Sequence, residues 1–389
     1  MKVNTKSFNK ALNVVSGGVD RKSTLAVLGN VALVSNEYYL KVMSSRLDLS
    51  YEVLIPVIDF INPIKTTIEH KILSKIGSAL TGDQVDITST FEEVGKDKVE
   101  KANLACGKYS SKLSTIDFEE FPPLRSFDGL DSIFIDAEKF VKVATKVLPA
   151  LSTDEARPVL CGMRFFVNNN RLMLEGTDGF RIVHDYIELE NTDNSFDIIV
   201  PQLTITEVIK TIKSTKCKTL ALKKHTHSKT KEYSAYDEIQ FSFKNTSSEL
   251  DVFLTSMLIE GNYPPTEIIM PRTLKIKSSV NVKESIDAVK QLKPILHETT
   301  NILRVTKKDG SIIFSCQSEE YGYNQVLVEE NSVGEDFAFA VNGSFFMDAL
   351  TITESDSMPI GFNANNCPLV FSDNNYQEFL SIVMPMHLG

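Results

Sequence analysis

One arrangement of strands and helices occurs three times along the chain, and this repeat limits the possible folds more than any other feature. The copies are spaced by roughly 130 to 145 residues, far beyond the periods of solenoid repeats. Each copy opens with a short strand, expected at 1–4, 132–135 and 273–277, and continues into an amphipathic helix. The apolar faces of these helices carry Phe8, Ala11, Leu12 and Val15, then Phe140, Val143, Ala144 and Val147, then Val282, Ile286, Val289 and Leu292. Asp136 is placed to cap the second of them.

The remainder of each copy also recurs. Strands are expected at 25–34 and 38–43, at 160–167 and 171–175, and at 301–306 and 311–316. A second helical pattern follows, carrying Phe60, Ile64 and Ile68, then Leu203, Val208, Ile209 and Ile212, then Phe345, Phe346, Ala349 and Leu350. The copies close on the related phrases LSTIDFEEFPP, LTSMLIEGNYPP and LSIVMP. Strands that carry two helices, repeated three times, predict three similar α+β domains, at 1–127, 128–265 and 266–389.

The composition indicates a folded protein whose charge is unevenly distributed. The chain has 41 Lys plus Arg against 51 Asp plus Glu, a net charge of -10, which argues against coating nucleic acid with the whole surface. Lysines are nevertheless dense between 210 and 231, so a positive lining within a negative shell is possible. No stretch approaches the about 20 apolar residues of a membrane span and no signal segment is present, which predicts a cytoplasmic protein without membrane contact. The five cysteines lack C-x-x-C spacing, so we expect no zinc site and no cofactor.

Five phrases carry a resemblance to a known family. They are TLAVLGNVALV at 24–34, ARPVLCGM at 156–163, GTDGFRIV at 176–183, IEGNYPP at 259–265 and the terminal VMPMHL. Their order, spacing and threefold repeat resemble the beta subunit of bacterial DNA polymerase III, the beta sliding clamp family. The resemblance implies a head-to-tail homodimeric ring with antiparallel sheets outside and helices around a central hole. It also implies a processivity subunit without catalytic activity. Its implied partners are encircled double-stranded DNA, the DNA polymerase III catalytic subunit, the clamp loader and other proteins with a clamp-binding motif.

Basic side chains on the expected helices are candidates for contact with DNA. Lys139, Lys142 and Lys146 fall at i, i+3 and i+7, on the face opposite the apolar one. Flexible lysines near phosphates would hold DNA without reading bases, which suits sliding. The full set of candidates is Lys6, Lys10, Lys22, Lys139, Lys142, Lys146, Arg157, Lys210 and Lys213. An ordinary solvated helix face is the alternative for each, and the last helical pattern carries acidic side chains and no lysine.

The family resemblance implies a groove for short peptides between the second and third domains, closed by the C-terminal tail. Its residues here would be Leu160, Thr177, Gly179, Phe180, Arg181, Ile182, Pro264, Ile268, Ile269, Pro368, Ile382, Val383, Met384, Pro385 and Met386. Phe180 stands where the family usually has histidine, Ile268 where arginine is common, and His387 with Gly389 in place of a terminal arginine-leucine. These changes make the groove more apolar and remove cationic donors. The tail itself is expected to form an edge strand whose extension from Met384 onward serves partners.

The dimer contact implied by the family joins the first domain of one subunit to the third domain of the other. Candidates are Lys108, Ser111 and Leu292, and Ser111 stands where a large apolar residue is often found.

Other functions remain open from the residues alone. One alternative is a clamp-fold adaptor that docks peptides without encircling DNA, and another is a hydrolase that uses Asp178 with His184 or Arg181. His225 and His227 have the spacing of a ligand pair but lie in a lysine-rich run, 223–238, that we interpret as an enlarged hairpin loop.

Overall fold

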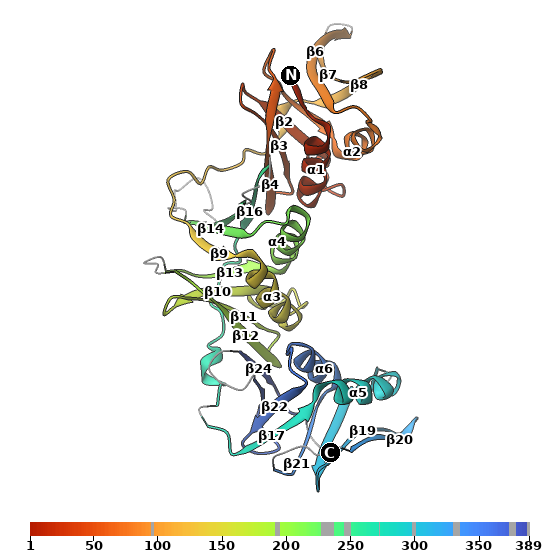
Figure 1. The fold of residues 1–389 in the computed structure, drawn as a ribbon, viewed down its shortest axis with the longest axis vertical. Coiled ribbons are helices and arrows are strands. Elements are labelled where there is room, and N and C mark those ends of the chain that lie inside the picture. Colours follow the sequence, from red (N-terminus) through yellow and green to blue (C-terminus); the bar gives the residue numbers. More distant parts are fainter. Residues whose placement is uncertain are drawn as a thin grey trace. The chain divides into compact units, whose positions relative to one another are not determined.

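The computed structural model describes the chain except for residues 95–96, 191–194, 227–236, 245–249, 272, 298–300, 330–334, 373–378 and 387–389. Its strands pair throughout in antiparallel fashion, in sheets of twelve, eight and four strands (Figure 1). Residue contacts divide the chain into two compact units, one of 1–141, 189–194 and 203–260 and one of 142–188, 195–202 and 261–389. The predicted mixture of helices and antiparallel sheets is confirmed.

The first unit is built on the twelve-stranded sheet. Its strands, in spatial order, are β1 (Lys2–Asn4), β6 (Gln84–Val94), β7 (Asp97–Cys106), β8 (Tyr109–Ile116), β5 (Lys65–Glu69), β2 (Asn30–Ser35), β3 (Tyr39–Ser45), β4 (Leu49–Asp59), β16 (Asp251–Met257), β15 (Glu238–Lys244), β14 (Thr219–His225) and β9 (Ile133–Asp136). The pairing of β4 with β16 makes strands of the first two repeats continuous, with Tyr51 opposite Leu254. Helix α1 (Thr5–Val15) packs against β4 and against α2 (His70–Ala79), and α4 (Gln202–Thr215) precedes β14.

Helix α1 forms where the apolar pattern predicts it. The side-chain oxygen of Asn4 accepts hydrogen bonds from the backbone N–H groups of Lys6 at 2.9 Å and Ser7 at 3.1 Å, which satisfies two of the free donors at the helix start. All four predicted core residues of α1 are buried. Asp136 caps α3 (Ala137–Val147) in the same way, accepting from the N–H of Lys139 at 2.8 Å.

The second helix of the first repeat lies further along the chain than predicted. Phe60, Ile64 and Ile68 do not form a helix, because β4 runs to Asp59 and the β-branched run around Ile68 forms β5. Pro63 also disfavours a helix there. Helix α2 begins only at His70, so the apolar pattern of this helix was assigned to the wrong residues.

The second unit holds the two smaller sheets. The eight-stranded sheet has the order β13 (Asp197–Pro201), β10 (Gly162–Asn168), β11 (Arg171–Thr177), β12 (Arg181–Glu188), β24 (Leu380–Val383), β23 (Leu369–Phe371), β22 (Ser357–Phe362) and β17 (Ile276–Asn281). The four-stranded sheet has the order β20 (Gly322–Glu329), β19 (Ser311–Ser318), β18 (Ile302–Lys308) and β21 (Phe337–Asn342). Helix α5 (Val282–His297) packs on β19, β20 and α6 (Gly343–Thr351). Buried Phe314, Phe339, Phe346 and Phe362 lie in the core between them.

The C-terminal strand is interior rather than the edge strand that the sequence suggested. Strand β24 pairs with β12 on one side and with β23 on the other, so that Ile382 lies opposite both Ile182 and Val370. All four residues of β24 are buried. The ladder ends before Pro385, whose ring could not donate to it.

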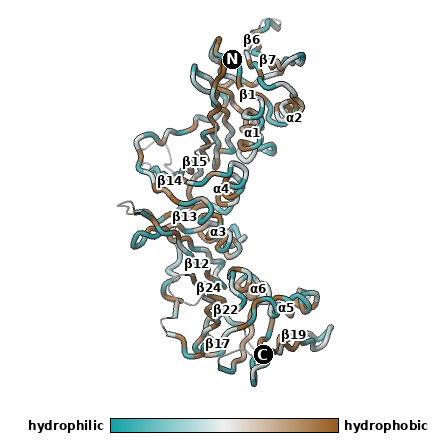
Figure 2. The backbone as a smooth tube through the Cα atoms, in the orientation of Figure 1, coloured by the Kyte–Doolittle hydropathy of each residue, from teal (hydrophilic) through white to brown (hydrophobic). Residues whose placement is uncertain are grey.

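Apolar residues are distributed along strands and helices alike, with no long uninterrupted apolar run (Figure 2). Within the described ranges, none of the helices combines the length and the apolar character that crossing a membrane requires.

Candidate functional site

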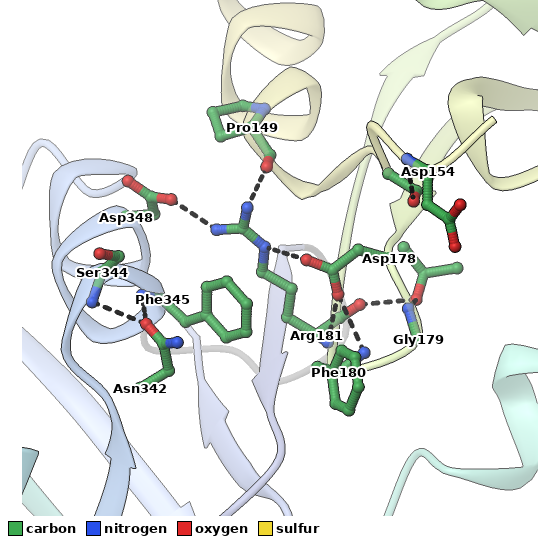
Figure 3. A network of polar contacts seen from close by, with 12 residues as sticks. Pro149, Asp154, Asp178, Gly179, Phe180, Arg181, Asn342, Ser344, Phe345 and Asp348 are labelled. Atoms are coloured by element: carbon green, nitrogen blue, oxygen red, sulfur yellow. Dashed lines mark hydrogen bonds and ion pairs between the residues drawn. The ribbon is translucent and has the colours of Figure 1, made fainter. Parts of the chain in front are cut away.

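The turn between β11 and β12, residues 177–181, is held by its own side chains (Figure 3). The hydroxyl of Thr177 accepts from the N–H of Gly179 at 3.0 Å and donates to the carbonyl of Arg181 at 2.6 Å. One carboxylate oxygen of Asp178 accepts from the N–H groups of Phe180 at 2.9 Å and Arg181 at 3.1 Å. Gly179 has φ +93°, a conformation that favours glycine. The turn is therefore rigid, and it presents the Phe180 ring to solvent.

Arg181 ties this turn to the C-terminal repeat. Its Nε donates to Asp178 at 3.0 Å, and its two terminal nitrogens donate to the carboxylate of Asp348 on α6 and to the carbonyl of Pro149 (Figure 3). The guanidinium group also lies 4.3 Å from the ring centroid of Phe345. Its side chain is only 12% exposed, so the guanidinium group binds partners within the protein rather than facing solvent. Asp178 likewise has a structural role here, in the turn and under Arg181.

Strand β24 brings the C-terminal tail to the same turn. The N–H of Met384 donates to the carbonyl of Phe180 at 2.9 Å, directly beyond the pairing of Arg181 with Val383. Beneath it, buried side chains of β12, β23 and β24 form an apolar cluster of Ile182, Val370, Leu380 and Ile382, against which Met270 and Leu274 pack. The tail is therefore anchored by a sheet, and the Met384 side chain is left exposed.

The segment at the junction of the central and third repeats, 261–267, is fixed by a buried polar network. Glu175 of β11 is 1% exposed; it accepts from the Thr266 hydroxyl at 2.8 Å and lies 3.4 Å from the guanidinium group of Arg164. Arg164 also contacts Asp197 at 2.7 Å. The Tyr263 hydroxyl donates to the backbone carbonyl of Glu175 at 3.4 Å, and burial, followed by the nearby Glu175 charge, raises the pKa of Tyr263. These contacts hold the segment whose next residues are the exposed Ile268 and Ile269.

The structure places the predicted groove residues in the second unit, at three depths. Leu160, Thr177, Ile182, Ile382 and Val383 are buried; Arg181, Pro264, Pro368, Pro385 and Met386 are partly exposed; Gly179, Phe180, Ile268, Ile269 and Met384 are exposed. We call the four apolar side chains of the exposed group, Phe180, Ile268, Ile269 and Met384, the apolar patch, since the groove implied by the family would bring them together. His387 and Gly389 lie outside the described residues.

Most of the predicted DNA-facing side chains are exposed, but several have acidic partners. Lys6 and Lys22 are exposed, as are Lys139 and Lys213, and Lys10 is partly exposed. Lys142 pairs with Glu354 at 2.8 Å and holds the pKa of that carboxyl below its usual value. Lys210 pairs with Glu207 at 3.2 Å, and Arg157 pairs with Asp154 at 3.1 Å.

The prediction of a solvent-facing lysine is wrong for Lys146. Its side chain is 16% exposed, because its Nζ lies 2.8 Å from the carboxylate of Asp185 on β12 and 4.8 Å from the ring centroid of Phe379. Helical periodicity places Lys146 on the same face as Lys139, but tertiary packing covers that end of the helix.

The sequence interpretation missed five exposed helix lysines. Lys71 and Lys75 lie on α2, and Lys283, Lys290 and Lys293 lie on α5. The α2 pair was overlooked because the helix was placed too early. The α5 set could have been found from the sequence, since it is out of phase with the predicted apolar positions of the same helix.

Of the three predicted dimer residues, Ser111 lies on a strand with a partly unpaired edge, Lys108 directly precedes that strand, and Leu292 lies elsewhere. Lys108 is exposed just before β8, and the Ser111 hydroxyl on β8 is buried without a hydrogen-bond partner in the described part of the chain. Strand β8 pairs with β5 only at Thr115 and Ile116. Leu292 is 3% exposed in the core under α5, so the prediction of an interfacial side chain is wrong there.

The histidine motif shows no sign of a metal site where it is described. His225 lies opposite Glu238 in the β14–β15 pair, and its ring meets Phe127 edge-on at 5.9 Å. His227 and most of the predicted hairpin loop lie outside the described residues. Among the residues that are described, no group of three His, Cys, Asp or Glu side chains could hold a metal ion.

Three α+β repeats joined by shared antiparallel sheets define the clamp class of fold. Family models for the N-terminal, central and C-terminal domains of the DNA polymerase III beta subunit match residues 1–125, 134–265 and 267–387. The chain therefore belongs to the DNA polymerase III beta subunit family, and the resemblance seen in the sequence is confirmed.

Relatives match over nearly the whole length. The beta sliding clamp of Streptococcus pneumoniae is 23% identical, with 99% of this chain and 98% of the relative covered, and that of Staphylococcus aureus is 23% identical with 97% of each covered. The solved DNA polymerase sliding clamp of Bacillus subtilis has a TM-score of 0.84 at 22% identity, covering 100% of this chain and 99% of its own. The DNA polymerase III subunit beta of Pseudomonas aeruginosa has a TM-score of 0.86 at 20% identity, with 100% of both chains covered.

Proposed function

We propose that this chain is the subunit of a DNA sliding clamp, a ring-shaped processivity factor that encircles duplex DNA. The observation that carries the proposal is the match of all three domains to one family, in order and with almost no residue left over. A clamp raises the effective concentration of a polymerase at its template by tethering, and it needs no chemistry of its own. We expect it in the cytoplasm.

The helices supply the charge that this role requires. Exposed lysines on α1, α2, α3, α4 and α5 give positive faces to a chain whose net charge is -10. Such side chains attract phosphates without reading bases, and the attraction weakens at high salt, where release of the counterions condensed on DNA gains less free energy. Lys6, Lys10, Lys22, Lys139, Lys142, Arg157, Lys210 and Lys213 are the proposed contacts, to which we add Lys71, Lys75, Lys283, Lys290 and Lys293.

The ring is proposed to form from two copies joined head to tail. Strand β20 is an edge strand of the four-stranded sheet, and β8 pairs with β5 at only two residues. Each of these strands therefore has backbone groups along one edge that could pair with a strand of another copy. Lys108 and Ser111 would lie at this contact. Sedimentation at several concentrations should show a dimer, and a monomer throughout would contradict the ring.

The apolar patch is the proposed docking place for the polymerase III catalytic subunit, the clamp loader and other proteins that carry a clamp-binding motif. Exposed apolar side chains in a group are typical of interaction sites, and Met384 can repack around different ligands.

Phe180→Ala should weaken binding of a polymerase-derived peptide about tenfold, as removal of an aromatic anchor commonly does. Leu47→Ala, at an exposed residue in the corresponding turn of the first repeat, is the control and should bind normally. Unchanged affinity for Phe180→Ala would reject the patch.

Retention on DNA tests encirclement itself. After loading by a clamp loader, the protein should stay on circular duplex DNA and leave once the circle is cut. Equal retention on both forms would reject the ring. Peptide binding without retention would instead favour the adaptor function. The hydrolase alternative has little support, because Asp178 is occupied by the turn and by Arg181.

A further inference from the structure

The apolar patch is accompanied by more carboxylates than cations. Three arginines on the elements that form its base make ion pairs with six acidic side chains. Arg157 pairs with Asp154; Arg164 pairs with Glu175, Asp197 and Glu267; and Arg181 pairs with Asp178 and Asp348. Each arginine is thus matched or outnumbered, and this set of described residues carries a net negative charge.

Two of the three cations are largely covered, whereas Arg157 is 47% exposed and several of the anions are exposed as well. Arg181 and Arg164 are 12% and 14% exposed, whereas the Glu267 side chain, directly before Ile268, is 61% exposed. Asp348 and Asp154 are also substantially exposed. Exposed carboxylates therefore outnumber exposed guanidinium groups in this set, with Glu267, Asp197, Asp154 and Asp348 against Arg157.

Arg181 in particular has few donors left for an acidic ligand. Its Nε and both terminal nitrogens already donate to Asp178, Asp348 and a backbone carbonyl, and its flat face covers Phe345. Three of its five N–H groups are thus taken, so a ligand carboxylate would have to share the guanidinium group with protein carboxylates that are already bound to it.

We propose that the apolar patch selects segments whose bulky apolar anchors are flanked by lysine or arginine, and that it discriminates against aspartate or glutamate at those flanks. The apolar anchors contact Phe180, Ile268, Ile269 and Met384, and the basic flank lies near Glu267 and Asp348. This inference rests on the docking role proposed above and adds the charge of the partner to it.

Three labelled peptides with one Leu-Leu-Phe core test the inference, flanked by lysine, by glutamine or by glutamate. Fluorescence anisotropy on the full chain should give the tightest binding for the lysine peptide and the weakest for the glutamate peptide. Exposed ion pairs suggest a span of about three- to tenfold between the two. The span should narrow in high salt, because screening weakens charge contacts and leaves apolar ones.

Glu267→Gln locates the effect. It should reduce the advantage of the lysine peptide and leave the glutamine peptide unchanged, whereas Glu37→Gln, in the exposed turn before β3, should change neither. Equal affinity for all three peptides, or preference for glutamate, would overturn the charge inference while docking stands. Failure of all three peptides to bind would reject the docking role, and the charge inference with it.

Discussion

The segments that end the first and second repeats follow the same backbone plan but are secured by opposite chemistry. Phe121-Pro122-Pro123 and Tyr263-Pro264-Pro265 occupy matching places at the ends of their repeats. In the first, Phe121 packs with Ala32 and Met43, which pair across β2 and β3. In the second, Tyr263 lies over Arg164 and Glu175, which pair across β10 and β11 in the same register.

The two arrangements also differ in the contacts that hold them. A cavity of about 330 Å³ lies beside the first segment, lined by Val34, Tyr39, Met43, Phe118 and Phe121 among others. The second segment is held by directional bonds from Thr266, Tyr263 and Arg164. Apolar packing tolerates gaps and small shifts, whereas a buried ionic network requires defined positions. The more exacting chemistry occurs beside the apolar patch, where Ile268 and Ile269 must be placed.

The largest expected effect comes from breaking the second arrangement. Arg164→Ala leaves the buried Glu175 carboxylate without its cation and should lower the free energy of unfolding by about 3 kcal/mol or more. Urea denaturation followed in the second unit is the measurement. Arg171→Ala, which removes an exposed pair with Glu188, is the control and should cost about 1 kcal/mol or less.

The double variant Arg164→Ala with Glu175→Met sharpens the comparison, because it copies Ala32 and Met43 of the first repeat. It should recover most of the stability lost by Arg164→Ala, since no unpaired charge remains. A double variant as unstable as the single one would show that the two segments are not interchangeable.

A smaller effect is expected from alkaline pH. Burial raises the pKa of Tyr263, so the folded state keeps its proton where the unfolded state has lost it. Stability from this group is complete below the unfolded pKa of about 10 and falls as pH rises above it, by about 1.4 kcal/mol per pH unit. The urea midpoint of the wild type should therefore fall more steeply than that of Tyr263→Phe over the roughly one and a half pH units from about pH 9.5 to about pH 11. Identical slopes would contradict the burial of this hydroxyl.

The smallest effect is expected from filling the first arrangement. Val34→Ile adds one methylene group at the wall of the cavity and keeps a β-branched side chain on β2. It should raise the free energy of unfolding by up to about 0.8 kcal/mol. Destabilisation would mean that the cavity cannot accept even this group without strain.

Prediction from the sequence succeeded where the signal was local. The apolar faces of α1 and α3 were predicted correctly because helical periodicity depends only on residues that are close in the sequence. Asp136 caps α3 as expected. It failed at α2, where the apolar Ile64 and Ile68 fit either a helix or a strand. The candidate groove residues were named from family motifs; the loss of cationic donors was expected from the sequence, but the surplus of carboxylates was not.

The sequence by itself determined the threefold repeat, most of the strands and helices, and the family, because each depends on short-range pattern and order. Only the tertiary structure decided which side chains are free. Arg181 is occupied by Asp348, 167 residues away; Lys146 is covered by Asp185; and β24 lies inside a sheet rather than at its edge. These contacts join residues far apart in the chain, so their energies leave no trace in local periodicity.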